Sequence, residues 1–479
     1  MTIPLGLPAL IAGATVLLCS CASRYDAERV DDRTRALYGA DSVAAEPSTA
    51  EADPGARAPA EPPMTAPGAT SRGGDDLADS ATLDSTELVE CLDYALANSA
   101  ELRAAYERWR AVTERVAQVS ALPDPRLTYG EFLEEVQTRT GPQERRFGAS
   151  QAFPWPGSLD AQADVAEHRA EAAWHQVEAV RLRVAEEVEV AYHDYAYFGR
   201  ELEINAELLD LLRGLEPVVQ GRVRTGGGQA DLVKLQVEVG RLEDGLASLE
   251  ARRPSISARL ARAMHLRSAA RALPLPTAVE PDVESVDRDR SYRAALERNP
   301  RLRELLQSLA AEQQAEKVAE YQRRPSFDVG VDYIQTGDAL DPTTPGSGDD
   351  PVLLRFGVSL PVWSSSYAAA ERESRHLARA LREELDAEEL RLRVGVEEHA
   401  FHVTDAARRI GLYRDSLLPR AEEALELTLT SYRTGEASVL DVIDSERALL
   451  EFEKSYWRAC RDYGQGRARL RALTSEGVQ

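Results

Sequence analysis

Two periods of apolar and polar residues run along the chain, and the first of them predicts helices. Near Leu83 the apolar positions begin to recur every three or four residues, and Asp84 or Ser85 can cap a helix that extends over about 85–120. The same period returns over about 287–321. Each of these helices opens one of two similar segments of the chain.

Two much longer helical patterns follow, from about Ser158 to Pro217 and from about Ser364 to Pro419. At a rise of 1.5 Å per residue, about fifty residues of helix extend for roughly 75 Å, far more than a globular core needs. The runs consist mainly of Ala, Leu, Glu and Arg, a mix typical of long packed helices. The chain is therefore predicted to be mainly α, with long, coiled-coil-like helices.

The second period is the strict alternation of β-strands, and it occurs in four segments that lie between the helices. Phe327–Tyr333 alternates without error, whereas Glu131 and Phe132 interrupt the first segment. Segments of this kind, with Gly on the polar face and aromatic residues near the ends, are typical of transmembrane strands; half-buried hairpins of a soluble protein are the alternative. The predicted strands are 125–136, 144–154, 326–336 and 352–362.

An internal repeat joins these elements into two copies of one unit. Two of the matching pairs are offset by 200 residues and three by 209. A repeat of about two hundred residues is too long for a solenoid and indicates two fused copies, which we predict to be 83–280 and 281–479. The pairs are Ala95-Leu96 with Ala295-Leu296, Pro125 with Pro325, Phe147-Gly148 with Phe356-Gly357, Ala191-Tyr192 with Ala400-Phe401, and Arg224-Thr225-Gly226 with Arg433-Thr434-Gly435.

The N-terminal segment resembles an export signal with a lipid-attachment site. Leu5 to Leu18 is an apolar stretch of signal-peptide length, and Leu18-Cys19-Ser20-Cys21 resembles a bacterial lipobox. We predict a signal peptide over 1–20, lipidation of Cys21 that includes palmitate, and a disordered linker over 21–82. The alternative is an ordinary signal peptide with an unmodified Cys21.

Composition and charge narrow the classes of function. The chain has 479 residues, of which 6% are aromatic, and a formal net charge of −24. A surface that binds nucleic acid needs clustered Lys and Arg, so we expect no nucleic-acid partner. No apolar run long enough for a transmembrane helix follows residue 21. The acidic excess suits a periplasmic or cation-handling surface.

The number of predicted strands points to an oligomer. Four strands cannot close a barrel, and open sheet edges are not tolerated in lipid. Two chains would give eight strands, whose interior is filled by side chains, whereas three chains would give twelve and leave a lumen. A pore therefore favours at least a trimer.

These features together resemble the TolC family of outer-membrane efflux proteins, over essentially all of 83–473. The most specific segment, Ser431–Asp444, is similar to the family's Y-x-x-G…D-V-x-D motif. The segment Phe153–Gly157 resembles the hairpin-to-helix turn of the branch that includes heavy-metal efflux lipoproteins. The resemblance implies a homotrimer in the bacterial outer membrane, with a twelve-stranded β-barrel and a long α-helical barrel in the periplasm. It implies as partners a periplasmic adaptor protein, an inner-membrane pump and outer-membrane lipid.

The resemblance also implies roles for single residues. Asp441 and Asp444 match aspartates that line the periplasmic gate in the family; they share one helix face, and threefold symmetry would place six carboxylates around the axis. The alternative is a helix start that favours acidic residues because of the helix dipole. The hairpin ends, where the adaptor docks in the family, correspond to Arg224, Thr225, Gly226, Arg433, Thr434 and Gly435.

Two tryptophans stand where each pair of strands returns to a helix. They are Trp155 and Trp363. This position suits an aromatic girdle at a membrane surface, because the indole ring combines an apolar body with a polar N–H group. We therefore predict that both lie at the membrane interface.

The sequence gives only a weak signal for catalytic or metal-binding residues. His399 and His402 beside Glu398 have the spacing of metal ligands on a helix, but three donors on an exposed helical face are common by chance. No phosphate-binding loop, nucleophile elbow or zinc-protease motif is present in the sequence. We predict no metal, no cofactor and no enzymatic activity, with an enzyme that has an acidic site as a remote alternative.

Some questions stay open at the level of the sequence. Cys91 and Cys460 can form a disulfide in an oxidising compartment or remain two buried thiols. The main alternative to a channel is a soluble periplasmic coiled-coil adaptor or scaffold. The exported substrate is not identified: the Phe153–Gly157 turn favours heavy-metal ions, and drugs or other small solutes remain open.

Overall fold

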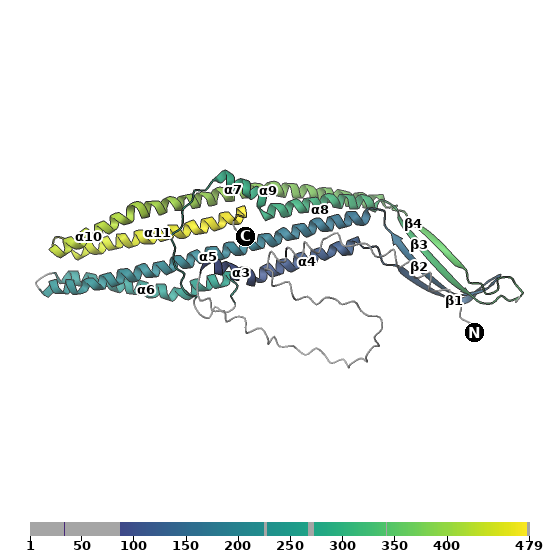
Figure 1. Ribbon diagram of the computed structural model, residues 1–479, viewed down its shortest axis with the longest axis horizontal. Coiled ribbons are helices and arrows are strands. Elements are labelled where there is room, and N and C mark those ends of the chain that lie inside the picture. Colours follow the sequence, from purple (N-terminus) through teal and green to yellow (C-terminus); the bar gives the residue numbers. More distant parts are fainter. Residues whose placement is uncertain (1–32, 34–86, 225–227, 267–272, 342, 477–479) are drawn as a thin grey trace, which may run out of the picture. The chain divides into compact units, whose positions relative to one another are not determined.

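The computed structural model describes residues 33, 87–224, 228–266, 273–341 and 343–476, which form long helices and one sheet (Figure 1). The prediction of a mainly α chain with a small β part is confirmed. Across these residues, no helix combines the length and apolarity needed to cross a membrane. The elements are α3 (Leu88–Asn98), α4 (Ala100–Ser120), β1 (Arg126–Thr138), β2 (Gly141–Phe153), α5 (Ser158–Arg224), α6 (Gln229–Ala263), α7 (Arg288–Arg298), α8 (Pro300–Gln322), β3 (Ser326–Thr336), β4 (Val352–Ser359), α9 (Ser364–Leu412), the π-helical turn η2 (Tyr413–Leu417), α10 (Leu418–Thr434) and α11 (Val439–Thr474).

The chain folds into two compact units, and each draws on both predicted repeats. Unit 1 contains 106–176 and 301–388, which include the sheet, most of α4, α8, and the beginnings of α5 and α9. Unit 2 contains 177–300 and 389–479, which include α6, α7, α10 and α11, together with α3. The order of helix, two strands and long helix is the same in both halves of the chain. The repeat boundaries stay a prediction; the predicted signal peptide and, apart from Arg33, the predicted linker lie outside the described residues.

The four strands of unit 1 form a single antiparallel sheet in the order β1-β2-β3-β4. The two predicted hairpins are joined through β2 and β3, where Phe153 pairs with Phe327. The register of β1 against β2 shifts between Glu131 and Val136, a bulge that explains why the alternation of apolar residues fails at this point. The sheet has two free edges within one chain, β1 and β4.

Both helices that were predicted to lead the repeats are broken in two. The first breaks at Ser99, whose hydroxyl accepts a hydrogen bond from the Leu102 amide at 3.2 Å and so caps α4. The second breaks at Asn299, because Pro300 follows it and fits only the first turn of a new helix. Local capping chemistry therefore interrupts an apolar period that continues across both breaks.

The predicted ends of the two long helices at proline are wrong. Pro217 lies inside α5, which continues to Arg224. The proline removes one backbone hydrogen bond, but buried packing of the following turn, such as that of Val219, compensates for the loss. Pro419 lies in the first turn of α10, directly after η2. There the amide of Leu418 donates to the carbonyl of Tyr413, five residues back, so the wider turn accommodates a proline that has no N–H group.

Unit 2 is held together by apolar clusters between its helices. Cys91 lies in a cluster formed by α3, α5 and α6, and Cys460 lies in a different cluster formed by α9 and α11. Both thiols are buried and unpaired. Burial raises the pKa of Cys91 to about 11 and that of Cys460 to about 12, so both stay protonated and unreactive at neutral pH. Of the two possibilities that the sequence left open, the structure has the buried thiols.

Candidate functional site

The sheet of unit 1 has one apolar face that is exposed to its surroundings. The side chain of Leu127 is 80% exposed and that of Phe356 is 71% exposed. Across β1, β2 and β3, Phe147 contacts Tyr129 and Tyr333, with ring centres 5.3 and 6.5 Å away respectively. An apolar face of this size is costly in water and marks a surface that meets lipid or protein.

The opposite face of the sheet is polar and is organised around Asp332. Its carboxylate lies 2.6 Å from the guanidinium of Arg146 on β2 and 3.5 Å from that of Arg355 on β4. The Asp332 side chain is 1% exposed, because it lies directly over Gly148 on the neighbouring strand. A Cβ atom at Gly148 would come within 2.3 Å of that carboxylate and 2.4 Å of the Thr128 hydroxyl. A glycine is therefore required where this ion-paired group crosses the sheet.

Trp155 and Trp363 occupy the predicted positions between strand and helix. Trp155 lies between β2 and α5 and stacks on Phe327 with ring centres 6.1 Å apart, while Trp363 lies between β4 and α9 and is exposed. Gly157 makes the turn into α5 with a φ of 84°, a left-handed conformation that favours glycine. The structure thus accounts for the Phe-Pro-Trp-Pro-Gly turn; a membrane contact of either tryptophan stays a prediction.

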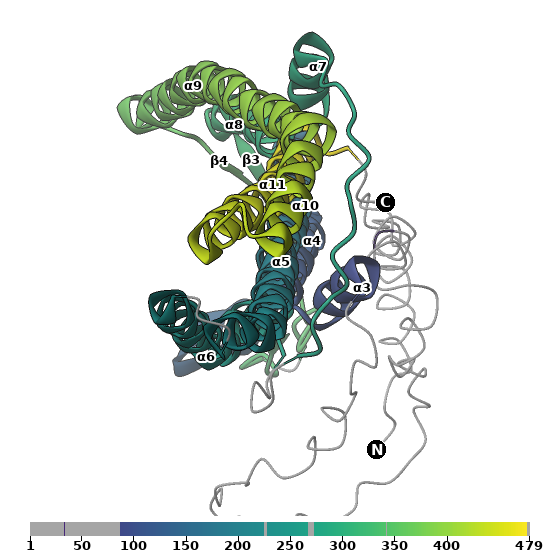
Figure 2. The same ribbon diagram turned by 90° about the vertical axis from the view of Figure 1, so that its left-hand side faces the viewer.

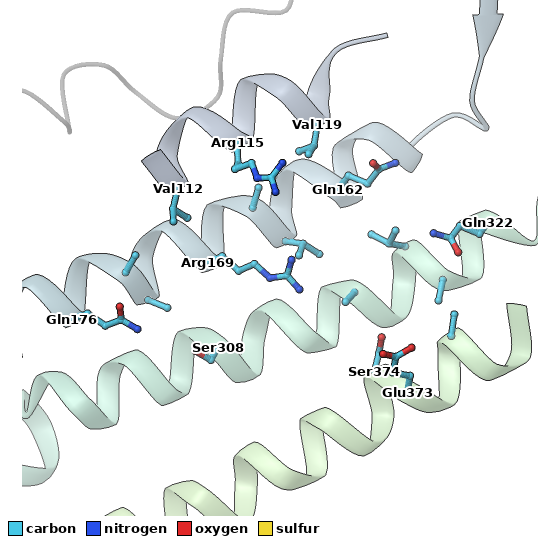
Figure 3. A pocket seen from close by; sticks show the side chains of 18 residues that line it. Val112, Arg115, Val119, Gln162, Arg169, Gln176, Ser308, Gln322, Glu373 and Ser374 are labelled. Atoms are coloured by element: carbon cyan, nitrogen blue, oxygen red, sulfur yellow. The ribbon is translucent and has the colours of Figure 1, made fainter. Parts of the chain in front are cut away.

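Next to the sheet, the helices of unit 1 line an open groove of about 820 Å³ (Figure 3). It is formed by α4, α5, α8 and α9, and many of its lining side chains are small or polar. Arg115 and Arg169 lie on its α4 and α5 side, and Ser308, Gln322 and Glu373 lie on its α8 and α9 side. Its alanines are Ala166, Ala172, Ala173, Ala315, Ala319 and Ala370. A wall of this kind leaves space for water and small solutes.

In unit 2, α10 and α11 form a helical hairpin whose turn explains the most specific sequence motif (Figure 2). Gly435 ends α10 with a φ of 89°, and the amide of Glu436 donates to the carbonyl of Ser431 at 2.9 Å. Three residues later Ser438 begins α11 in a capping box, in which the Asp441 carboxylate accepts from the Ser438 amide at 2.8 Å. The motif therefore encodes a stop and a restart of helix within a few residues.

The two predicted gate aspartates differ in their surroundings. The Ser438 amide and hydroxyl both donate to Asp441 and lower the pKa of its carboxyl group, so this side chain acts as a helix cap. Asp444 is exposed and lies 3.5 Å from Arg447 on the next turn. Within one chain, the surroundings of Asp441 thus fit the alternative interpretation, an acidic residue at the start of a helix. A gate role for either residue stays a prediction.

The α10–α11 hairpin is fixed to the α5–α6 hairpin by two contacts that the sequence did not suggest. The Arg222 guanidinium on α5 donates to the backbone carbonyl of Tyr432 and stands 3.9 Å from the centre of its ring. Arg447 on α11 donates to Glu238 on α6 at 3.0 Å. The partners are separated by 210 and 209 residues, so only the folded chain brings them together.

The predicted docking residues lie at the ends of these hairpins as far as the structure describes them. Arg224 is the last residue of α5 and is exposed, and Arg433 and Thr434 are exposed at the end of α10 beside Gly435. Thr225 and Gly226 lie outside the described residues, as does Cys21.

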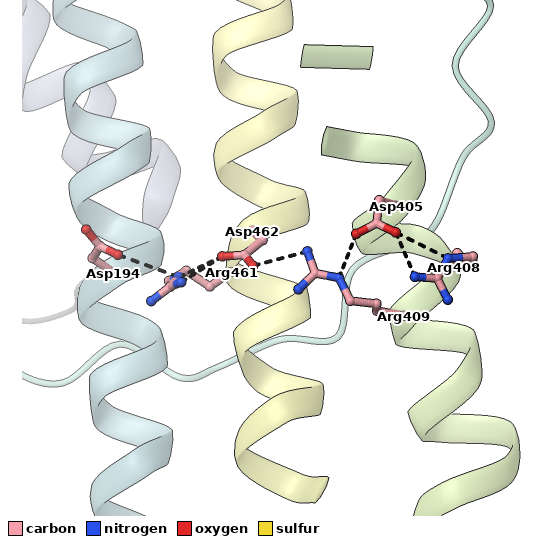
Figure 4. A network of polar contacts seen from close by, with 6 residues as sticks. All are labelled: Asp194, Asp405, Arg408, Arg409, Arg461 and Asp462. Atoms are coloured by element: carbon pink, nitrogen blue, oxygen red, sulfur yellow. Dashed lines mark hydrogen bonds and ion pairs between the residues drawn. The ribbon is translucent and has the colours of Figure 1, made fainter. Parts of the chain in front are cut away.

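A chain of alternating charges crosses unit 2 and connects three of its helices (Figure 4). Arg461 on α11 lies 3.8 Å from Asp194 on α5 and 2.7 Å from its neighbour Asp462. Asp462 in turn lies 3.4 Å from Arg409 on α9, which also pairs with Asp405 at 3.0 Å. Because these side chains are only partly exposed, the network orients α5, α9 and α11 relative to one another.

The weak metal-binding candidates gain no support from the geometry. His402 lies 3.8 Å from Glu398, and burial lowers the pKa of His399. Within the described residues, the carboxylates of Glu316, Glu320 and Glu371 are close enough to hold an ion, but Arg375 already pairs with the first and third of them. These groups therefore form an ion-paired helix surface.

Comparison with known proteins identifies the fold. OprN, an outer-membrane channel, is 18% identical with a TM-score of 0.65, and the match covers 81% of this chain and 90% of OprN. The outer membrane protein VceC of Vibrio cholerae is 16% identical with a TM-score of 0.64, covering 82% of this chain and 97% of VceC. The MtrE channel of Neisseria gonorrhoeae, in its open state, is 16% identical with a TM-score of 0.65, covering 82% of this chain and 89% of MtrE. Comparison with curated protein sequences gives no match.

The fold is that of outer-membrane channels with a helical barrel and a β-barrel part, as the resemblance implied. Residues 291–476 match the family model "Outer membrane efflux protein". The predicted resemblance is thereby confirmed.

Proposed function

We propose that the chain is one subunit of a homotrimeric duct through the bacterial outer membrane, with its helical body in the periplasm. The duct passively conducts solutes delivered by an inner-membrane pump through a periplasmic adaptor. The observation that carries the proposal is the sheet, with an exposed apolar face on one side and an ion-paired polar face on the other. Such a sheet suits a barrel wall with lipid outside and water inside.

The free edges of the sheet support a trimer. Edge strands β1 and β4 each carry unpaired backbone groups, and lipid offers no hydrogen bonds to satisfy them. Three copies would join edge to edge into a closed barrel of twelve strands with a lumen. The sheet leads directly into α5, whose 67 residues extend for roughly 100 Å, a length that suits a tube across the periplasm.

The hairpin ends of unit 2 are the proposed gate and docking region. In the trimer, Asp441 and Asp444 would form an acidic constriction around the axis that attracts cations. The adaptor would dock on the residues of the hairpin ends, namely Arg224, Thr225, Gly226, Arg433, Thr434 and Gly435.

A lipid on Cys21 is compatible with the position of Arg33, the first described residue. Arg33 pairs with Glu171 at 2.9 Å and stands 4.8 Å from the centre of the Trp174 ring. The twelve residues from Cys21 to Arg33 can reach at most roughly 40 Å, and Glu171 lies about 20 Å along α5 from its start at Ser158. A lipid anchor at Cys21 is therefore within reach of the proposed membrane interface at Trp155.

The proposal is tested by purifying the full chain from outer membranes and measuring its mass in mild detergent and its conductance in a planar bilayer. A trimer that conducts supports the duct. A monomer that leaves the membrane when Cys21 is replaced and does not conduct would instead support a periplasmic scaffold or adaptor.

The gate is tested by the double substitution Asp441→Ala and Asp444→Ala. We expect higher single-channel conductance and weaker block by multivalent cations, because the acidic ring is removed. Glu451→Ala, on an exposed face of the same helix, is the control. Currents and block identical to those of the unmodified channel would remove the gate role from both aspartates.

A further inference from the structure

Glu446 occupies a position on α11 where the sequence period calls for an apolar side chain. The buried face of this helix includes Val439, Val442, Ile443 and Leu450, and Glu446 lies between them. It is 2% exposed. A carboxyl group in the core between two helical hairpins is costly, so its presence requires a physical reason.

Both carboxylate oxygens of Glu446 lack a hydrogen-bond partner among the described residues. The charged group that acts on it from the facing helix is Glu238 of α6, which is 7% exposed. Glu238 accepts from Arg447 at 3.0 Å, and Arg447 also lies 3.5 Å from Asp444. The single guanidinium group here is thus already shared by Glu238 and Asp444, and the burial of Glu446 beside Glu238 is compensated only when Glu446 carries a proton.

Among the described residues, no cation forms an ion pair with Glu446. On α5, Arg213 pairs with Glu243 of α6 at 2.6 Å, and Glu216 accepts from Gln236 of α6 at 3.0 Å. On α10, Arg420 lines a separate groove together with Asp444. The neighbouring core is apolar, and α5, α6 and α10 contribute to it Leu212, Leu235 and Leu425 respectively.

These surroundings have a direct consequence for protonation. Burial, and next the negative charge of Glu238, raise the pKa of Glu446 to about 8. The folded pKa thus lies above that of a solvated glutamate, so the stabilising contribution is complete below the solvated value and is lost as the pH rises through the folded one.

Resting on the proposed function, we propose that Glu446 is a proton-dependent lock between α6 and α11. With a proton bound, the α10–α11 hairpin stays packed against the α5–α6 hairpin and the periplasmic end stays closed. Loss of the proton leaves a buried, uncompensated negative charge, which favours the form in which the hairpins separate and Glu446 meets water. The channel is then closed at neutral pH and opens more often as the medium becomes alkaline.

The lock is tested by recording single-channel open probability of the full-length trimer between pH 6 and pH 9. We expect a rise of at least about tenfold in the unmodified channel, because a form that exposes Glu446 gains by roughly tenfold per pH unit below the folded pKa. Glu446→Gln, which is always neutral, should abolish the rise and keep the low open probability of pH 6. Glu451→Gln, which removes an exposed carboxylate from the same helix, should keep it. An unchanged rise in Glu446→Gln overturns the proposal.

A second measurement separates the lock from the proposed duct. Thermal unfolding needs no conduction and also reports whether Glu446→Gln folds. We expect the unmodified protein to lose stability relative to Glu446→Gln as the pH rises from 6 to 8. A stability difference that is independent of pH overturns the lock even if the channel conducts. A protein that does not conduct but shows the pH-dependent difference overturns the duct and leaves the proton-dependent contact between α6 and α11 standing.

Discussion

Unit 1 and unit 2 each contain a nearly fully buried carboxylate, Asp332 on the polar face of the sheet and Glu446 on the apolar face of α11, and the two differ in their partners. In the sheet, Asp332 lies between Arg146 and Arg355, one from each neighbouring strand. In the helical hairpins, Glu446 has no hydrogen-bond partner within the part of the chain that the structure describes, and it faces a second carboxylate, Glu238. A paired charge fixes the geometry of its surroundings, whereas an unpaired one makes its surroundings responsive to pH.

The comparison is tested most strongly by Asp332→Ala. The substitution leaves two guanidinium groups without their shared partner on one face of the sheet, and we expect a loss of about 3 kcal/mol in the free energy of unfolding. Urea titration followed by tryptophan fluorescence is suitable, since Trp155 stacks on Phe327 at the end of the sheet. Asp328→Ala is the control, because Asp328 lies 3.9 Å from Arg355 and makes the weaker contact. Equal losses in the two variants would show that Asp332 has no special role.

A smaller effect is expected from Gly148→Ala, which leaves all charges in place. The new methyl group would overlap the carboxylate of Asp332, so the ion pair with Arg146 must shift at a cost of about 2 kcal/mol. Gly130→Ala on the neighbouring strand is a matched control, because a Cβ atom there meets nothing within 4 Å. The same urea titration compares them, and equal stability of the two alanine variants would refute the steric argument.

The smallest effect, of opposite sign, is expected from Glu446→Leu. Replacement of an unpaired buried carboxyl group by an apolar side chain of similar size should stabilise unit 2 by about 1 kcal/mol at pH 8. Chemical unfolding of the full chain at that pH measures the change. A loss of stability comparable to that of Asp332→Ala would mean that Glu446 has a partner in the assembled protein, and the contrast between the two units would disappear.

Most of the sheet and the hairpin turn could be predicted from short stretches of sequence. The alternation in Phe327–Tyr333 and its failure at Glu131 correspond to a regular strand and a bulge. The Gly435 and Ser438 caps are local as well, because each depends on residues within one turn of helix. Local chemistry of this kind is readable without knowledge of the fold.

The rest depends on contacts between distant segments or on competition between signals. The contact of Arg222 with Tyr432 joins residues 210 positions apart, and that of Arg146 with Asp332 joins residues 186 apart. The end of α5 was misplaced because packing beyond Pro217 outweighs the hydrogen bond that this residue cannot form. The sequence shows Glu446 as one acidic residue within a regular apolar period. Its unusual protonation, however, also depends on Glu238, a buried carboxylate of another helix, which the sequence does not place beside it.

The π-helical turn Tyr413–Leu417 changes the angular position of the side chains around the helix axis between α9 and α10. A turn of this kind adds one residue to the helical count, which rotates the side chains that follow by about 100° around the axis. The apolar stripe of α10 therefore starts from a new angle and can follow α11, while α9 keeps the frame set by its own neighbours. A single heptad frame therefore cannot be drawn through both helices, and the apolar positions of α10 have to be counted from its own start.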